Sequence, residues 1–225
     1  MLDMTRQSFF AFHPLVSAVA AVFILPSCDG SSSGDALAGL GDEFDIAALS
    51  EPVLRLCAEA ECGDYSQSEC EFYVRYDSLS GARFSEDAEA CFDALVVHFD
   101  CLADAGSCNE ESCDPPEEAC VLRAQVSSIR VPEALEPTRE ACEFLADCAI
   151  AEGSTDRPLA LAECQADLVS RAEIFLEDRG NSCAQSFIDF IACIGRADLS
   201  CDAGAEDEDE ACPQESAAFT AHCFP

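Results

Sequence analysis

Cysteine content constrains this chain more than any other feature, because 17 of its 225 residues are cysteine. Such a density is typical of a disulfide framework, and disulfides persist only where the surroundings do not reduce thiols. Cys28 directly follows an apolar N-terminal segment, and an even number of cysteines follows it. We expect these sixteen to form structural disulfides: Cys57, Cys62, Cys70, Cys91, Cys101, Cys108, Cys113, Cys120, Cys142, Cys148, Cys164, Cys183, Cys193, Cys201, Cys212 and Cys223.

The spacing of the cysteines argues against metal or redox chemistry. Zinc sites need Cys-x2-Cys pairs or nearby histidines, and thiol oxidoreductases need Cys-x2-Cys at the start of a helix. The chain contains no Cys-x2-Cys, and only His98 and His222 follow the N-terminal segment. We therefore expect no metal site and no cofactor, and a thiol-based redox protein is the weakest of the functional alternatives.

The N-terminal segment has the features of an export signal. Its apolar core, residues 15–25, is shorter than the roughly twenty apolar residues that a membrane-spanning helix needs. It ends in Leu25-Pro26-Ser27-Cys28, which resembles the lipobox of bacterial lipoproteins, although proline stands where a small residue is usual. The resemblance implies that residues 1–27 are a signal peptide and that Cys28 carries a lipid anchor. Cleavage after Ala36-Leu37-Ala38 is the alternative, and it would remove Cys28.

The charge limits the possible partners. The formal net charge is −34, and all 11 basic residues are arginine. Phosphate groups are bound by clustered cations, so we expect no nucleic acid to bind and anionic lipid surfaces to be repelled. A cationic protein, or an envelope polymer bridged by divalent cations, fits this charge.

An internal duplication is indicated by the order of the cysteines. Glu51-Pro52 resembles Glu136-Pro137, and each pair is followed by a similar series of cysteines. Cys57, Cys62, Cys70, Cys91, Cys101, Cys108 and Cys120 align with Cys142, Cys148, Cys164, Cys183, Cys193, Cys201 and Cys212, which leaves Cys113 and Cys223 as extra cysteines. Apolar residues also align at helical spacing: Leu95, Val96, Phe99 and Leu102 with Phe187, Ile188, Ile191 and Ile194.

Each copy is expected to contain about four helices. The first helix would begin near Glu51 and near Glu136, since proline is tolerated in a first turn. Capping boxes predict helix starts at Ser66 and Ser182, and glycine predicts an end before Gly81. The remaining expected helices are 158–179, one after Ser85-Glu86-Asp87, and two that begin near Pro116 and Pro213.

The sequence thus predicts an all-α fold with two homologous disulfide-rich four-helix modules in tandem. Residues 28–43 form a flexible tether, 44–125 the first module and 126–225 the second. The acidic run 206–210 is expected in a loop. The Cys-x9-Cys pairs at Cys91 and Cys183 resemble, in spacing alone, the helices of the twin Cys-x9-Cys family, and we interpret them as structural cross-links.

Eight cysteines in one module allow 105 pairings, and their spacing does not choose among them. We expect the aligned cysteines to pair alike in both modules. Cys113 and Cys223 would then either bridge the modules or replace each other's local partners.

No catalytic constellation stands out. The position of His98 is taken by Phe190 in the second copy, which favours a packed or half-buried histidine, and His222 is expected on the surface. We expect no enzymatic activity and no catalytic residue. The general organisation resembles that of uncharacterised cysteine-rich bacterial lipoproteins.

The prediction is therefore an exported, lipid-anchored cell-envelope protein, or a secreted one, that acts as a binding or structural module. The alternatives are a carboxylate-dependent extracytoplasmic hydrolase with a site between the modules, and a surface protein that binds calcium weakly through residues 206–210.

Overall fold

The computed structural model describes residues 37, 39–41, 43–59, 66–106, 113–121, 129–151, 153, 156–201 and 203–224. Within these residues the chain is helical and has no strand, which confirms the predicted all-α fold. The α-helices are α1 (Ile46–Glu59), α2 (Gln67–Phe84), α3 (Ala88–Ala105), α4 (Arg139–Ala151), α5 (Arg157–Arg179), α6 (Asn181–Arg196), α7 (Ala205–Ala211) and α8 (Pro213–Cys223). Two short 3₁₀ helices span Pro116–Glu118 and Glu133–Thr138.

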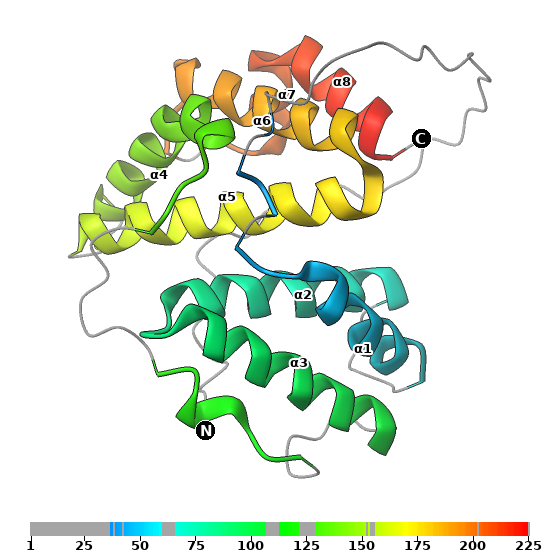
Figure 1. Ribbon diagram of the computed structural model, residues 1–225. Helices are drawn as coiled ribbons and strands as arrows, with labels where there is room; N and C mark the ends of the chain where they lie inside the picture. Colours follow the sequence, from blue (N-terminus) through cyan, green and yellow to red (C-terminus); the bar gives the residue numbers. More distant parts are fainter. Residues whose placement is uncertain are drawn as a thin grey trace.

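The α-helices form two groups, which lie one below the other in Figure 1. In the first group α1, α2 and α3 pack against one another. In the second group α4, α5, α6 and α8 pack together, and the short helix α7 contacts α8. Most of the contact between the groups is made by α2 against α5. We call this contact the seam.

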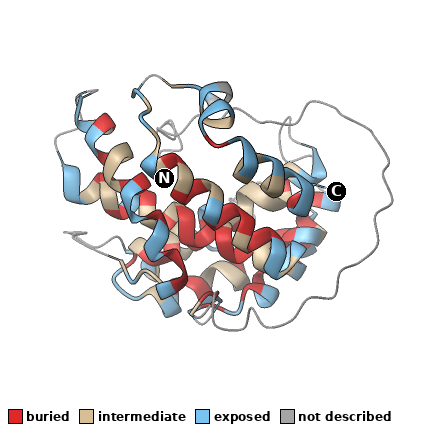
Figure 2. Ribbon diagram, turned by 90° about the horizontal axis from the view of Figure 1, so that it is seen from above, coloured by how far each residue is buried: buried red, intermediate tan, exposed pale blue. Residues whose placement is uncertain are grey.

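Each group encloses its own apolar cluster, and the buried residues gather where the helices face one another (Figure 2). The first cluster contains Leu49 and Val53 of α1, Leu79 of α2 and Phe92 of α3. Ile174 of α5 also belongs to this cluster, so the seam contributes to the core of the first group.

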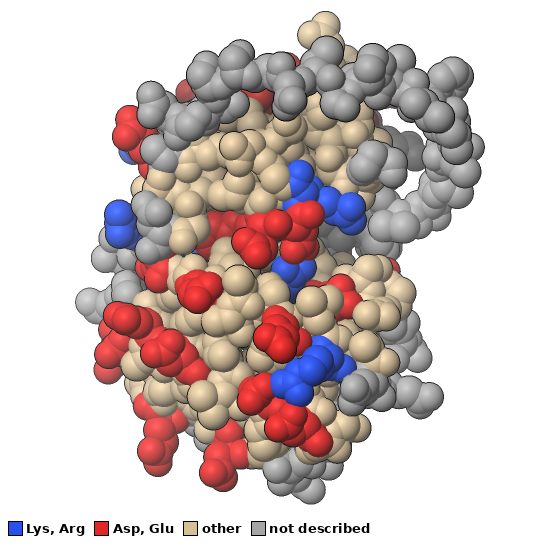
Figure 3. Space-filling model, turned by 45° about the vertical axis from the view of Figure 1, so that its right-hand side comes forward, with Lys and Arg blue, Asp and Glu red and all other residues tan. Residues whose placement is uncertain are grey.

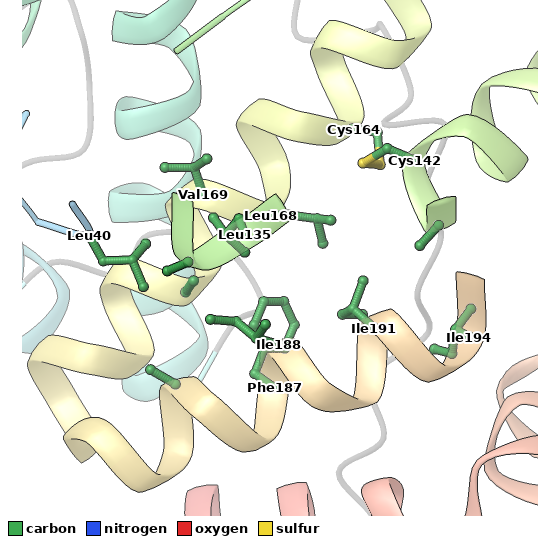
Figure 4. Packing of buried hydrophobic residues seen from close by; sticks show 14 of the residues in the cluster. Leu40, Leu135, Cys142, Cys164, Leu168, Val169, Phe187, Ile188, Ile191 and Ile194 are labelled. Carbon is green, nitrogen blue, oxygen red and sulfur yellow. A yellow bond between two sulfur atoms is a disulfide. The ribbon is translucent and has the colours of Figure 1, made fainter. Parts of the chain in front are cut away.

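The second cluster is built on α6, where the stripe of Phe187, Ile188, Ile191 and Ile194 faces α5 and Leu135 (Figure 4). The matching stripe of α3 is half-buried at Leu95, Val96 and Phe99 and buried at Leu102. Helix α6 also approaches α4 closely. A Cβ atom on Gly195 would lie 2.3 Å from the backbone nitrogen of Ala141, so this contact requires glycine.

Two predicted helix ends in the first group are wrong because buried side chains outweigh local signals. Helix α1 begins at Ile46, before Glu51, and Pro52 lies inside it, since Ile46 and Leu49 are both buried. Helix α2 begins at the predicted capping box of Ser66 but continues through Gly81 to Phe84. Tertiary packing commonly overrides the weak preferences of single residues.

In the second group, helix α5 matches the predicted helix 158–179, but α6 begins at Asn181 without the predicted capping box at Ser182. Gly180, with φ of 79°, ends α5 and precedes α6 directly, a left-handed conformation that favours glycine.

The acidic run 206–210 is helical and belongs to α7, so the prediction of a loop is wrong. The Gly204 N–H donates to the Asp207 carboxylate at 2.8 Å, and carboxylates near a helix N-terminus are stabilised by the helix dipole.

Fourteen of the predicted disulfide cysteines are paired among the described residues. Each predicted module contains a set of eight cysteines, which we number in chain order. In both sets the first cysteine bonds the third, the fourth bonds the eighth and the fifth bonds the seventh. The second bonds the sixth in the second set. The bonds are Cys57–Cys70, Cys91–Cys120 and Cys101–Cys113, and Cys142–Cys164, Cys148–Cys201, Cys183–Cys223 and Cys193–Cys212.

This order corrects the alignment of the last cysteines. Cys113 corresponds to Cys212, and Cys120 corresponds to Cys223, so neither set has an extra cysteine. Cys113 and Cys223 each bond within their own set, and the proposed bridge between modules through them is wrong.

The helix predicted near Pro116 is only a 3₁₀ turn in the structure. Ten residue steps of helix separate Cys91 from Cys101 on α3, a rise of about 15 Å. Cys113 and Cys120, which bond to them, are only seven residue steps apart, and the turn lies between them. The eleven steps from Cys212 to Cys223 rise about 16.5 Å, which matches α6, and they contain helix α8.

The packed part of the chain begins before the predicted module boundary at residue 44. Leu37 and Leu40 lie within the predicted tether 28–43, and both are buried in the second cluster. Phe44 and Ile46 follow in the first cluster. The described residues of this segment, 37, 39–41 and 43–46, therefore contact both groups, and we call them the strap.

The order of the bonds predicts the partner of the two remaining cysteines, Cys62 and Cys108, which lie outside the described residues. They are the second and sixth of the first set, and their counterparts are bonded as Cys148–Cys201. A non-reducing peptide map should therefore contain a Cys62–Cys108 cross-linked peptide. Either cysteine found as a free thiol, or bonded to the second set, would contradict the shared order.

Candidate functional site

A buried ion pair lies at the seam. Arg83 of α2 pairs with Glu173 of α5, and their side chains are 2% and 1% exposed. The Arg83 guanidinium also donates from Nη1 to Ser170 Oγ at 2.7 Å, and Ser170 Oγ lies 3.1 Å from Ser80 Oγ. Loss of one partner from a buried pair leaves an uncompensated charge and typically costs about 3–5 kcal/mol. Substitution of either Arg83 or Glu173 by an uncharged residue should therefore destabilise the seam.

The strap covers this ion pair. The Gly41 N–H donates to Glu173 Oε1 at 3.2 Å, and Glu43 Oε2 lies 3.2 Å from Arg83 Nε. The Nε–H has no hydrogen-bond acceptor in the described part of the chain, so its contact with Glu43 is one of charge. The guanidinium also lies 4.9 Å from the ring centre of Phe44, a cation–π contact.

Further polar pairs extend along the seam. Arg75 donates to both carboxylate oxygens of Asp178, with Nη1 2.8 Å from Oδ1. Tyr76 donates its hydroxyl to Asp167, which also accepts from Arg171 Nε at 3.1 Å. These pairs lie nearer the surface than Arg83 and Glu173. The contact between the two groups is thus rich in charge, whereas each cluster is apolar.

Burial dominates the pKa values of two carboxylates at the seam, Glu173 and Asp167. It raises the pKa of Glu173 above its usual value, and the attraction of Arg83 and the Gly41 N–H offset this only in part. It likewise raises the pKa of Asp167, against the attraction and hydrogen bond of Arg171. Both carboxylates therefore take up protons more readily in the folded protein than in an unfolded chain.

A pocket of about 390 Å³ opens beside the strap. Its walls come from the strap and the start of α1 on one side and from α5 on the other. It is lined by Gly41, Glu43, Phe44, Asp45, Ile46, Ala47, Glu173, Leu176 and Glu177.

The pocket combines four carboxylates with three large apolar side chains and no basic residue. Its lining includes no histidine, cysteine or hydroxyl group that would act as a nucleophile. Among the described residues no group of three or more potential ligands is arranged to hold a metal ion. The arrangement therefore favours attraction of a positively charged group over covalent chemistry.

The predicted site residues are scattered rather than gathered. His98 is buried on α3, with Nδ1 3.0 Å from the Asp114 carbonyl oxygen, and His222 is exposed on α8. Glu208 of α7 is half-buried, and burial together with Asp209 and Asp207 raises its pKa to about 7. Cys28 and the predicted signal peptide lie outside the described residues.

Sequence reasoning missed Arg83 and Glu173. Glu173 follows Ala166 and Ser170 at helical spacing, on a buried face of α5. A carboxylate on such a face indicates a buried charge that is paired with a basic residue. The pattern does not identify which arginine is the partner.

The disulfides also bear on location. Seven cross-links among the described residues indicate an extracytoplasmic protein, because such bonds are rare where thiols are kept reduced. None of the described helices has the length and apolar character that would be required to span a bilayer.

Comparison of the chain with protein-family models, with curated proteins and with solved structures found no match.

The raised pKa values predict that the protein becomes more stable on acidification from pH 8 to pH 5. A raised folded-state pKa stabilises the fold fully below the unfolded value and loses this effect as pH rises through the folded value. For Glu208 this window runs from its ordinary 4.5 to about 7. Glu69 and Asp147 have lowered pKa values, so their opposing effect falls below pH 5. Denaturant midpoints measured between pH 5 and 8 should rise as pH falls.

The Glu208→Gln variant removes the titrating group from this comparison. It should be more stable than the wild type at pH 8 and show a flatter dependence between pH 5 and 7. Glu210→Gln, an exposed position on the same helix, serves as the control. A wild-type midpoint that falls on acidification in this range, or an unchanged slope in Glu208→Gln, would contradict the assignment.

Proposed function

We propose that the protein is lipid-anchored in the cell envelope after export and acts as a non-enzymatic binding or structural module. The observation that carries the proposal is the set of disulfides, which belongs to an oxidising compartment. The sequence Leu25-Pro26-Ser27-Cys28 supplies the anchor position. In this proposal Cys28 becomes the first residue of the mature chain.

We further propose that the two groups of helices descend from one duplicated four-helix module. The shared order of disulfide bonds supports this. Cys91 and Cys101 on α3 also occupy the same positions as Cys183 and Cys193 on α6. In this proposal the seam joins the second helix of each copy, α2 and α5. The fourth helix of the first copy is reduced to the turn at Pro116–Glu118.

The anchor would hold the protein close to its membrane. Nine residue steps separate Cys28 from Leu37, the first buried residue described. A fully extended chain of this length spans about 30 Å. A partner of the anchored protein would therefore be another component of the envelope near the membrane surface.

The surface charge indicates the chemistry of that partner. Arg55, Arg75, Arg83, Arg139, Arg157 and Arg171 all pair with carboxylates of the same chain. Figure 3 shows acidic side chains spread over one face, with the few basic side chains beside them. The remaining negative charge favours a cationic protein or peptide, or an anionic polymer bridged by divalent cations.

A carboxylate-dependent hydrolase is the second candidate, and the raised pKa of Glu173 beside the pocket is the observation that favours it. Both Glu173 oxygens are already engaged, however, one by the Gly41 N–H and the other by Arg83. A general acid needs a proton that can reach the substrate. The binding module therefore remains the better supported proposal.

The anchor is tested by Cys28→Ala, with Ser33→Ala in the same segment as the control. The wild type and Ser33→Ala should fractionate with membranes and carry a lipid mass on residue 28, because lipid attachment needs the cysteine. Cys28→Ala should lose the lipid mass and leave the membrane fraction. An unmodified wild-type chain that begins at residue 39 would contradict the anchor.

The partner chemistry is tested with the same preparations. A synthetic arginine-rich peptide should bind the protein with an affinity that falls steeply as salt is added, whereas an uncharged peptide of equal length should not bind. Peptide binding that is absent at low salt would contradict the cationic partner, and an anionic polymer that does not bind when calcium is added would contradict the bridged polymer.

A further inference from the structure

The strap is a second connection between two groups of helices that otherwise meet mainly at the seam. Leu37 and Leu40 are buried in the second cluster, although they precede the first group in the chain. Phe44 and Ile46 are buried in the first cluster, and Phe44 stacks on Phe92 at 4.7 Å between ring centres. The strap thus lies across the boundary with apolar side chains in both clusters.

The strap also completes the buried ion pair at the seam. Glu43 and Phe44 contact the Arg83 guanidinium, and the Gly41 N–H satisfies Glu173. Without these contacts Glu173 would lose a hydrogen-bond donor, and Arg83 would lose its second carboxylate and its aromatic neighbour. Buried charges are expensive when their partners are incomplete, so the closed seam depends on a docked strap.

No described disulfide holds the two groups together. All seven lie within residues 44–125 or within residues 126–225. Interfaces between such units, when they are polar and not cross-linked, permit relative motion by default. The seam is polar at Arg75, Tyr76 and Arg83, and it also contains the buried Ile174 and a contact between the rings of Phe72 and Phe175. The cross-links therefore stabilise each group without stabilising their contact.

We propose that the strap is a latch that keeps the seam closed, and that its release lets the two groups of helices separate. Undocking removes Leu37 and Leu40 from the second cluster and uncovers Arg83 and Glu173. It also removes one wall of the acidic pocket, because Gly41, Glu43 and Phe44 line it. The strap is the described segment nearest to Cys28, so in the anchored protein a pull on the chain would act on the latch first. That last step rests on the proposed anchor; the latch itself rests on the described contacts.

Hydrogen exchange on the purified, disulfide-bonded protein tests the latch. The variant Leu37→Ala with Leu40→Ala weakens docking of the strap in the second cluster. Peptides from α2 and α5 that contain Arg83 and Glu173 should exchange at least about tenfold faster than in the wild type, which corresponds to a loss of about 1.4 kcal/mol. The control, Leu145→Ala with Leu161→Ala, weakens the same cluster from α4 and α5 without touching the strap sequence.

A milder pair of variants guards against general unfolding. Glu43→Gln removes the strap charge beside Arg83 and leaves no cavity, and Glu51→Gln is the matched control on the exposed side of α1. Glu43→Gln should speed exchange of the Arg83 peptide, and Glu51→Gln should not. Equal acceleration at the seam in the leucine control, or unchanged exchange there in both strap variants, would overturn the latch. Because no variant touches Cys28, failure of the latch leaves the proposed anchor standing, and failure of the anchor leaves the latch standing.

Discussion

The structure depends on a pair of nested disulfides on one helix in each half. On α3 the cysteines at 91 and 101 bond the segment that follows, and on α6 the cysteines at 183 and 193 do the same. A single disulfide contributes typically about 2–4 kcal/mol, mainly by restricting the unfolded chain. The nested pair also holds the following segment against its helix at two points. That segment contains a helix, α8, in the second half and a short turn in the first.

Cross-linking of this kind suits a strongly acidic chain. Mutual repulsion of carboxylates favours expansion, and the chain has only 11 arginines against 45 acidic residues. Most of the described arginines pair with carboxylates of the same chain. Arg83, the most buried of these arginines, lies where the two halves meet. The cross-links hold each half, while the seam and the strap hold the halves to each other. The acidic exterior then stays available for the cationic partner that we propose.

Much of the fold follows from local patterns in the sequence. The helical stripe from Phe187 to Ile194 and the capping box at Ser66 both occur as predicted, and cysteine density predicts the disulfides. The burial of His98 follows from the aromatic residue at the matching position. These features depend on neighbours in sequence or on composition, so they need no knowledge of the tertiary structure.

The features that failed depend on distant contacts. The alignment of Cys120 with Cys212 is wrong, because the two cysteines bond to different positions in the order of their sets. The pairing of Arg83 with Glu173 joins residues ninety positions apart, and no local spacing encodes it. In the sequence, Leu37 and Leu40 look like a short apolar stretch within a tether. Their burial depends on the second cluster, whose residues are distant in the chain.

The central claim is that sulfur cross-links within each half support the fold. The most direct test is far-ultraviolet circular dichroism and thermal unfolding of the purified protein before and after full reduction in native buffer, with complete reduction verified by mass. The account predicts that the reduced protein loses its cooperative unfolding transition and most of its helical signal. A reduced protein that keeps its helical signal and unfolds at the same temperature as the oxidised protein would contradict it.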